Sequence, residues 1–446
     1  YRGEGNTHLV ISLPREKVIL RLHKVEYDVE ITNSLLEDHE RKLLRDVYFY
    51  RKVMVTLLGT SFFQPPRLVR INEKYVSQID QSLFARRPRY RLKKGIRHGL
   101  ATIHPDYTHL PPHFQNLSSN IYDVYYMSTQ YNSTYCIEIK PKQGWIPLLD
   151  RKHFKCTFCM NQYLKFMNKR ILGISRYCPL DLFSGNLLRM KRAIGNLLMT
   201  PQNNLKIFKD GNLIFSEDCN RNYLEVLKDF FMMGSEDEVN IDKLIDRWCS
   251  LVVKGLCTQF VPNTTSYKPH LTTANNSVLI ASTDYILKTN NGLTSFHGQI
   301  KPCDWSSQPL PNDCILQRIL KIQQLQNNNF AAVCSLYRKK YTLRKEDYSY
   351  IKSLLDSDVE MDIIQRYLLA TTAKDCSIFV ALKLASKFDL PCKNHFIKDC
   401  EGVGYKFNIS VSDIDPKPLS CIDKHIKREK EIYDAMLQFM HHTTSA

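Results

Sequence analysis

The chain has 446 residues, of which 62 are Lys or Arg and 45 are Asp or Glu, and this balance gives a formal net charge of +17 at pH 7. The length allows one large domain or two ordinary ones. A hydrophobic content of 43%, with 21 Phe and 24 Tyr but 16 Gly, excludes a wholly disordered or collagen-like chain. No apolar run approaches the roughly 18 residues of a membrane helix, so we expect no membrane span. The positive charge favours an anionic partner such as a nucleic acid, an anionic membrane surface or a small polyanion.

The start of the chain and its cysteines indicate the compartment. The first residue is Tyr1, and no charged-then-apolar leader follows it, so we expect no signal peptide. Because an initiator Met is lacking, we expect a few residues to precede Tyr1. The 14 cysteines are irregularly spaced, which is typical of reduced thiols and not of a disulfide framework. The expected location is therefore the cytoplasm, the nucleus or both.

The front of the chain predicts a β-hairpin followed by a long helix. Gly3 and Gly5 give a turn signal between two β segments, and residues 18–22 are the second strand candidate. Apolar residues recur at helical spacing from about 37 to 58, and Gly59 is a stop signal.

The rest of the chain predicts mainly helices. We expect a strand at 135–142 that ends in a Pro turn, and two more strands at 377–382 and 406–412. Helical patterns cover 159–167, 186–198, 223–232, 240–256, 314–326, 347–369 and 422–440. Between about 259 and 304 the chain is polar, and we read this segment as a surface insertion without an assigned role. Strands crowd the front and helices the back, so the fold class is α+β with a smaller N-terminal lobe.

The sequence EIKPK at 138–142 can place three charges on one small area. Side chains alternate along a strand, so Glu138 and Lys140 lie on one face, and Lys142 joins them if the extended path survives the proline. Lysine suits phosphate, and a nearby carboxylate can hold the lysine or a metal ion. The alternative is a solvated strand end with a routine ion pair.

Three other short patterns also have a functional and an ordinary interpretation. Gly3 and Gly5 can let backbone N–H groups approach a phosphate, or can simply form a hairpin turn. Asp375, before an apolar strand, can face a substrate hydroxyl as a base or orienting group, or can cap a turn. Asp413 and Asp415 can bind Mg²⁺ at a strand end, or again cap a turn.

The run HFKCTFC contains a CxxC pair at Cys156 and Cys159, whose spacing lets two thiolates share one tetrahedral zinc ion. His153 is a candidate third ligand and Cys178 a candidate fourth, chosen for proximity in the sequence. Two ordinary thiols are an equally good interpretation of the pair by itself.

The order of several segments along the chain resembles the inositol-pentakisphosphate 2-kinase family, animal type. The segments are YRGEG at the front, EIKPKQGWIP at 138–147, CPLDLFSG at 178–185, PQNNLKIFKDG at 201–211, TAKDCS at 372–377 and DIDPKP at 413–418. The resemblance implies a two-lobed, distantly protein-kinase-like fold, with an N-lobe at 1–105 and a C-lobe at 106–446. It also implies transfer of the γ-phosphate of ATP to the 2-hydroxyl of inositol 1,3,4,5,6-pentakisphosphate, giving inositol hexakisphosphate (phytate).

The same resemblance implies roles for single residues. On the nucleotide side, it implies that the front turn and Arg21 of the second strand contact the ATP phosphates. The implied ATP-side residues are Gly3, Glu4, Gly5, Asn6, Arg21, Glu138, Asn204 and Asp413. Asp413 is also the implied ligand of Mg²⁺. It implies that Lys140 stabilises the transferring phosphoryl group and that Asp375 orients or deprotonates the 2-hydroxyl. The implied inositide contacts are Lys142, Lys165, Asn203, Lys206 and Lys417.

Two departures from the family pattern bear on these roles. Lys206 stands where some relatives have an arginine, so a bidentate contact there becomes a point contact. Beyond Lys417, where some relatives carry further basic and Tyr ligands, this chain has Cys421, Lys424, His425 and Lys427. Animal-type relatives have an equivalent of the HxxCxxC run and of Cys178, which favours a closed structural zinc site formed by His153, Cys156, Cys159 and Cys178.

The expected partners are therefore ATP and inositol pentakisphosphate, with no specific nucleic acid, and the chain is expected to act as a monomer. The main alternative is a non-enzymatic protein that binds nucleic acid or phosphoinositide through its +17 charge and the basic run 86–97. That run can equally be a solvated face.

Overall fold

The computed structural model describes residues 1–112, 133–233, 240–260, 302–340, 348–354, 360–385 and 395–444. Most of the polar insertion predicted at 259–304 lies outside these residues. In the described part of the chain, no helix is both long and apolar enough to cross a membrane.

A five-stranded antiparallel sheet is formed by the first 105 residues. Its strands are, in spatial order, β1 (Gly3–Glu4), β2 (His8–Leu13), β3 (Val18–His23), β7 (Leu100–Pro105) and β5 (Arg67–Arg70). The predicted hairpin is confirmed by the pairing of β2 with β3. Leu20 and Leu22 pack on one face against α3 (Glu73–Phe84), while Arg21 and His23 alternate to the opposite face. Helix α3 was not predicted, although Asn72 caps it.

The long helix predicted near 37–58 is present and begins a little earlier. It consists of α1 (Asn33–Phe49), a π-helical turn at Tyr50–Met54 and α2 (Val55–Leu58). Thr32 caps its start by accepting from the Leu35 N–H, and Gly59 ends it at a φ of 89° that favours glycine. The π-helical turn widens the helix where Tyr50 reaches another part of the chain, a placement that such turns often have.

The larger sheet is built after residue 133. Its six antiparallel strands are, in spatial order, β10 (Asn212–Phe215), β9 (Leu205–Lys209), β8 (Thr134–Ile139), β11 (Ser377–Leu384), β13 (Gly404–Ser412) and β12 (Phe396–Lys398). The three strands expected in this region are confirmed, but the expectation that strands crowd the front is wrong. It failed because β9, β10 and β12 are only three to five residues long, too short for a clear alternating pattern in the sequence.

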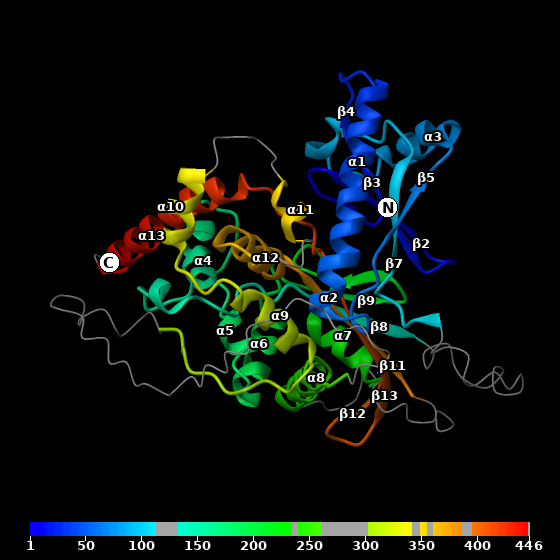
Figure 1. The fold of residues 1–446 in the computed structure, drawn as a ribbon. Coiled ribbons are helices and arrows are strands. Elements are labelled where there is room, and N and C mark those ends of the chain that lie inside the picture. The colour runs from blue at the N-terminus through cyan, green and yellow to red at the C-terminus, as the bar shows by residue number, and fades with distance from the viewer. Residues whose placement is uncertain are drawn as a thin grey trace, which may run out of the picture.

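Helices cover this sheet and extend away from it (Figure 1). They are α4 (Thr157–Met167), α5 (Pro179–Leu182), α6 (Leu187–Met199), α7 (Tyr223–Phe230), α8 (Ile241–Leu256), α9 (Ile315–Gln324), α10 (Phe330–Lys340), α11 (Tyr350–Leu354), α12 (Ile363–Asp375) and α13 (Cys421–Thr444). Two strands, β4 (Val25–Glu26) and β6 (Lys94–Gly95), form a small separate sheet, and short 3₁₀ turns occur at Arg89–Arg91 and Leu148–Asp150. The prediction of a single helix over 347–369 is wrong, because α11 and α12 are separate helices there.

One large hydrophobic core joins the inner face of the six-stranded sheet to the helices. It contains Ile137 and Val380 of the sheet, Leu251 of α8 and Met54 of the π-helical turn. Helix α8 approaches the sheet closely at Gly255, where a β-carbon would lie 3.4 Å from Val380 Cγ1. At the far end of the molecule from the first sheet, α13 lies beside α4 and α10 (Figure 1). Separate sheets with their own helices are consistent with the α+β class.

Candidate active site and metal centre

Strand ends bring four of the quoted segments to one edge of the six-stranded sheet. Because β8 and β13 both run antiparallel to β11, their last residues lie beside the first residues of β11. Ile139 pairs with Ile378, and Ser412 pairs with Ser377. Strand β9 begins at the same edge, since Leu205 pairs with Ile139. The residues that follow β8 and β13 therefore meet those that precede β11 and β9.

Two carboxylates, an ammonium group and a hydroxyl meet at this edge. Lys140, just after β8, donates from Nζ to Asp413 Oδ2, just after β13, at 2.9 Å. Ser377 Oγ lies 2.9 Å from Oε1 of the buried Glu138 and 3.0 Å from Asp413 Oδ2. A hydroxyl has one hydrogen, so Ser377 can donate to one carboxylate at a time.

The ion pair of Lys140 and Asp413 stays charged although both side chains are partly removed from solvent. Burial opposes ionisation of Asp413, but Lys140 and Arg21 hold its pKa below the ordinary value. Burial likewise favours neutral Lys140, but Asp413 and Glu138 raise the pKa of this ammonium group above its ordinary value. Each partner therefore stabilises the charge of the other at neutral pH.

Asp375 is the last residue of α12 and faces two lysines. Lys417 Nζ donates to Asp375 Oδ2 at 2.6 Å, and Lys142 Nζ lies 4.0 Å from Oδ1. Burial alone would raise the pKa of Asp375, but Lys417 and then Lys142 lower it below its ordinary value. The side chain is 54% exposed, so its carboxylate is both ionised and accessible.

Lysines gather next to this carboxylate. Burial lowers the pKa of Lys142, Asp375 raises it, and Lys140 and Lys165 lower it further, with a net decrease. The pKa of Lys165, at the last turn of α4, is also lowered, first by burial and then by Arg428 of α13. Each of these cations destabilises the charged form of its neighbours, and a bound polyanion would stabilise all of them.

Three residues at this edge adopt left-handed backbone conformations without being glycine. They are Lys142 at φ 62°, Asp413 at φ 57° and Gln202 at φ 44°. Such conformations cost about 1–3 kcal/mol each for a residue with a β-carbon. Their presence in three separate segments means that the surrounding structure holds these segments in place against local preference.

The QNN segment at 202–204 precedes β9 and lies at the same edge of the sheet. The carbonyl of buried Asn204 accepts from the Lys140 N–H at 2.9 Å, and Asn203 is exposed beside it. Lys206 lies opposite Glu138 across the pairing of β9 with β8, so both side chains share one face of the sheet.

Arg21 of the first sheet meets the same region through Asp415. Its two terminal nitrogens donate to the two oxygens of Asp415 at 3.0 and 2.8 Å, and the hydroxyl of Tyr50 also donates to this carboxylate. Burial opposes ionisation of Asp415, yet Arg21 lowers its pKa well below the usual range. The sequence indicated only a possible magnesium ligand at Asp415. The structure shows that its ion pair with Arg21 connects the first sheet to the segment after β13 of the six-stranded sheet.

Glu4 is held inside the first sheet. Its carboxylate is 1% exposed and accepts from Arg87 at 2.9 and 3.0 Å and from Lys24. Its side chain is therefore committed to ion pairs, and the neighbouring Gly5 N–H donates to the His8 carbonyl at 2.9 Å in the β1–β2 turn. Arg87 belongs to the basic run 86–97, which is therefore a solvated face only in part, since Arg87 is buried while Arg86, Arg89 and Lys93 are exposed.

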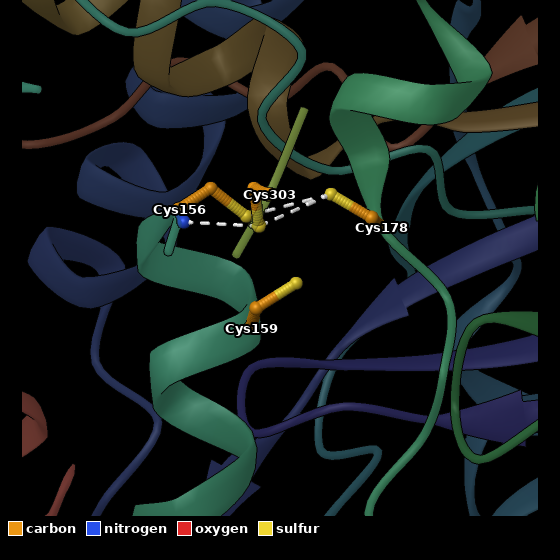
Figure 2. A group of neighbouring side chains, drawn as sticks. All are labelled: Cys156, Cys159, Cys178 and Cys303. Atoms are coloured by element: carbon orange, nitrogen blue, oxygen red, sulfur yellow. Dashed lines mark hydrogen bonds between the residues drawn. The ribbon is translucent and has the colours of Figure 1, made fainter. Parts of the chain in front are cut away.

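Four cysteines from three segments converge between α4 and α5 (Figure 2). Cys178 Sγ lies 3.9 Å from Cys156 Sγ and 3.7 Å from Cys303 Sγ, and all four sulfurs, with that of Cys159, lie within 4.8 Å of one another. A tetrahedral zinc ion with Zn–S bonds of about 2.3 Å separates its sulfurs by about 3.8 Å. The two distances at Cys178 match this geometry, and the remaining sulfur pairs lie within about 1 Å of it.

His153 is not part of this group. Its ring packs against Tyr433 of α13, with centroids 4.7 Å apart, and Cys303 occupies the place that we expected His153 to take. The error arose because His153 is near Cys156 in sequence, whereas Cys303 is far from it and lies at the end of the segment 259–304, to which we assigned no role. No spacing rule links Cys303 to the other three.

The family model for inositol-pentakisphosphate 2-kinase matches residues 1–431. The chain belongs to the inositol-pentakisphosphate 2-kinase family. An inositol-pentakisphosphate 2-kinase of Danio rerio is 30% identical, over 98% of this chain and 92% of its own length. Another from Arabidopsis thaliana is 24% identical, over 97% and 91%, and one from Drosophila melanogaster is 29% identical over 49% of each chain.

Most residues that the resemblance to inositol-pentakisphosphate 2-kinases implied lie along the shared sheet edge. Sequence reasoning missed Ser377, although it lies inside the quoted segment TAKDCS, because a serine at a strand start has many ordinary roles. It also missed Tyr50, whose partner Asp415 is distant in the sequence. Among the residues beyond Lys417 that depart from the family pattern, His425 bonds through Nδ1 to the Tyr367 hydroxyl at 2.7 Å.

A second close group of possible metal ligands is formed by His23, His39 and His98. His98 Nδ1 accepts from the Leu100 N–H at 3.2 Å, so in the neutral ring Nε2 carries the proton, and it lies 2.9 Å from His39 Nδ1. Burial, followed by the neighbouring histidines, lowers the pKa of His23 to about 3. We interpret these rings as neutral packing partners of α1 and the first sheet.

Proposed function

We propose that this chain transfers the γ-phosphate of ATP to the 2-hydroxyl of inositol 1,3,4,5,6-pentakisphosphate, which yields inositol hexakisphosphate. The proposal rests on one observation above all, namely that Lys140, Asp375 and Asp413 come from three separate segments and meet at one sheet edge. Phosphoryl transfer requires mainly positioning and stabilisation of charge, and these groups supply both. Family membership supports the choice of substrates.

The inositide site is proposed beside Asp375. Lys142 and Lys417 pair with Asp375 from a loop and from the segment after β13, and Lys165 at a helix end interacts electrostatically with Lys142. Several ammonium groups with few carboxylates suit a ligand that carries five phosphates. Lys206 and Asn203 are proposed as further contacts from the QNN side.

Asp375 is proposed to orient the 2-hydroxyl by accepting its hydrogen bond. Because Lys417 and Lys142 lower its pKa, Asp375 is a weak base at neutral pH. A loose phosphoryl-transfer transition state needs little proton removal before the phosphoryl group moves. Orientation of the hydroxyl is therefore the larger part of the role that we assign to Asp375.

The nucleotide is proposed to lie between the two sheets, with residues 1–105 as the N-lobe and 106–446 as the C-lobe of a kinase-like fold. The first sheet is complete at Pro105, which supports this boundary. Backbone groups at Gly3, Gly5 and Asn6, together with Arg21, would face the ATP phosphates. Glu138 and Asn204 would contribute from the C-lobe edge. Because Arg21 is bound to Asp415, nucleotide must share or replace that ion pair.

Magnesium fits Asp413. Its Oδ2 contacts Lys140 and Ser377, and its side chain is 46% exposed, so carboxylate oxygen remains available to a hard cation. When bound, Mg²⁺ would neutralise charge on the transferring phosphates. The chain's own contribution is to hold Asp413 and Lys140 next to each other.

The test is incubation of the full chain with ATP, Mg²⁺ and inositol 1,3,4,5,6-pentakisphosphate, followed by anion-exchange chromatography. We expect inositol hexakisphosphate to appear in proportion to ADP. Release of ADP without hexakisphosphate, or phosphorylation of a different inositol phosphate in preference, would contradict the proposal. Salt-dependent binding of polynucleotide without any turnover would instead favour a non-enzymatic basic protein.

We also propose that the four cysteines hold a structural zinc ion. Hydrogen bonds among the thiols, first from Cys159, and burial raise the pKa of Cys156, whereas hydrogen bonds from the other three thiols, first from Cys156, lower the pKa of Cys303, so without a cation the group is not a full set of thiolates. A divalent cation reverses that preference because thiolates bind it directly. Four protein ligands close the coordination sphere, which is typical of structural zinc.

The thirteen cysteines of the described residues are all free, which suits an intracellular protein, cytoplasmic or nuclear.

Replacing Cys156 and Cys159 together by Ser is expected to reduce bound zinc from about one ion per chain to none, because two of four ligands are lost. The melting temperature should fall, since the metal links α4 to the segments around Cys178 and Cys303. Metal analysis of the purified protein measures the stoichiometry. The control is His153→Asn, which lies outside the group and should keep its zinc. Equal zinc in all three proteins would refute the ligand assignment.

A further inference from the structure

Gln323 is a buried carboxamide at a position where the helix pattern predicts an apolar side chain. It lies near the end of α9, one turn after Ile319, and it is 0% exposed. A polar group that is fully buried loses its water and must find partners within the protein. The partners of Gln323 therefore show what this position does.

All four hydrogen-bonding positions of this amide are used. Oε1 accepts from the N–H groups of Gly144 and Trp145 at 2.8 and 3.2 Å. Nε2 donates to the carbonyls of Lys142 and Ala373 at 2.9 and 3.4 Å. An amide has two acceptor lone pairs and two donor hydrogens, so no capacity remains.

The partners belong to two segments of the proposed active site. Three of them lie in the loop 142–145, which begins with the left-handed residue Lys142. The fourth, Ala373, is in the last turn of α12, two residues before Asp375. One side chain thus connects the backbone that carries Lys142 to the backbone that carries Asp375.

The loop has no regular structure of its own and depends on such contacts. It packs tightly, since a β-carbon on Gly144 would lie 2.2 Å from the Phe183 ring. On the other side of Lys142, the Tyr177 hydroxyl donates to the Pro141 carbonyl at 2.7 Å. Because Lys142 adopts an unfavourable backbone conformation, loss of these partners would let the loop relax.

Gln326, just beyond α9, also connects the loop 142–145 to the end of α12. Its carbonyl accepts from Trp145 Nε1 at 3.2 Å, and its side-chain oxygen accepts from Lys374 Nζ at 2.7 Å. Trp145 belongs to the loop and Lys374 precedes Asp375. The end of α9 therefore carries two glutamines that both join the same two segments.

We propose that Gln323 is a positioning residue that fixes Lys142 relative to Asp375, and so sets how the polyphosphate substrate is held against the group that orients its hydroxyl. This inference rests on the proposed function. It extends that function to a residue which contacts neither substrate, and which acts through backbone groups alone. A misplacement of about 1 Å at such a site can cost about a hundredfold in rate.

The test compares Gln323→Met with Gln365→Met in steady-state kinetics, below the melting temperature of both. Gln365 is a matched control because it is 5% exposed and its amide also joins separate segments, accepting from the Asp362 N–H at 2.7 Å and donating to Ser353 Oγ at 2.6 Å. It lies at the opposite end of α12 from Asp375. Both variants should melt earlier than the wild type.

For Gln323→Met we expect kcat to fall, and KM for the inositide to rise, by about ten- to a hundredfold with KM for ATP unchanged. For Gln365→Met we expect wild-type kinetic constants. If Gln323→Met does not fold, Gln323→Asn keeps the amide on a shorter stem and should show the same pattern at smaller amplitude. Wild-type constants in a folded Gln323 variant, or equal changes at Gln365, would overturn the inference. An inactive wild-type protein would instead refute the proposed function.

Discussion

Replacing Asp375 by Asn is expected to lower kcat by about 10²- to 10⁴-fold, the usual range for a positioned acid or base. The amide has the same shape as the carboxylate but can turn its NH₂ group toward the substrate hydroxyl, and it no longer attracts Lys417 and Lys142. Product formation from ATP and inositol pentakisphosphate measures the effect. The fold should survive, because the Asp375 side chain is 54% exposed and Lys417 and Lys142, which lose their carboxylate, both still reach solvent.

Substrate affinity separates the two roles that Asp375 can have. An orienting group acts mainly in the transition state, so KM for the inositide should change little. The matched control is Asp434→Asn on the exposed face of α13, which should leave both constants unchanged. Retention of full activity by Asp375→Asn would remove this residue from the proposed mechanism.

Replacing Lys140 by Met is expected to lower kcat by about 10²- to 10³-fold, the range seen when one charge-stabilising donor is lost. The stem keeps a similar length, but the ammonium group that contacts Asp413 disappears. Asp413 then loses the main partner that holds its pKa below the ordinary value, so its pKa should rise. The activity of the variant should therefore decline at a higher pH than that of the wild type as the solution is acidified. The pH profile of kcat measures this shift.

Two further variants serve as comparisons for Lys140→Met. Lys140→Arg keeps the charge but changes its geometry, so we expect partial activity only. Lys352→Met, at an exposed position of α11, should behave as the wild type. If Lys140→Met retained wild-type kcat, stabilisation of the phosphoryl group would have to come from another cation.

Local sequence determined the elements that have strong periodic patterns. The helices near 186–198 and 240–256 follow from apolar spacing, and each is capped by an asparagine. The end of the long helix follows from Gly59, whose positive φ favours glycine. The order of the quoted segments also sufficed to place the chain in its family, since that order does not depend on knowing the fold.

The tertiary structure decided what meets at the proposed site. Lys140, Asp375 and Asp413 are brought together by the register of three antiparallel strands, and register depends on pairing between distant segments. Cys303, the fourth cysteine of the proposed zinc site, and the partners of Gln323 are likewise joined across long stretches of chain. Local propensity carries no signal for such contacts, because their free energy is gained only when the whole chain has folded.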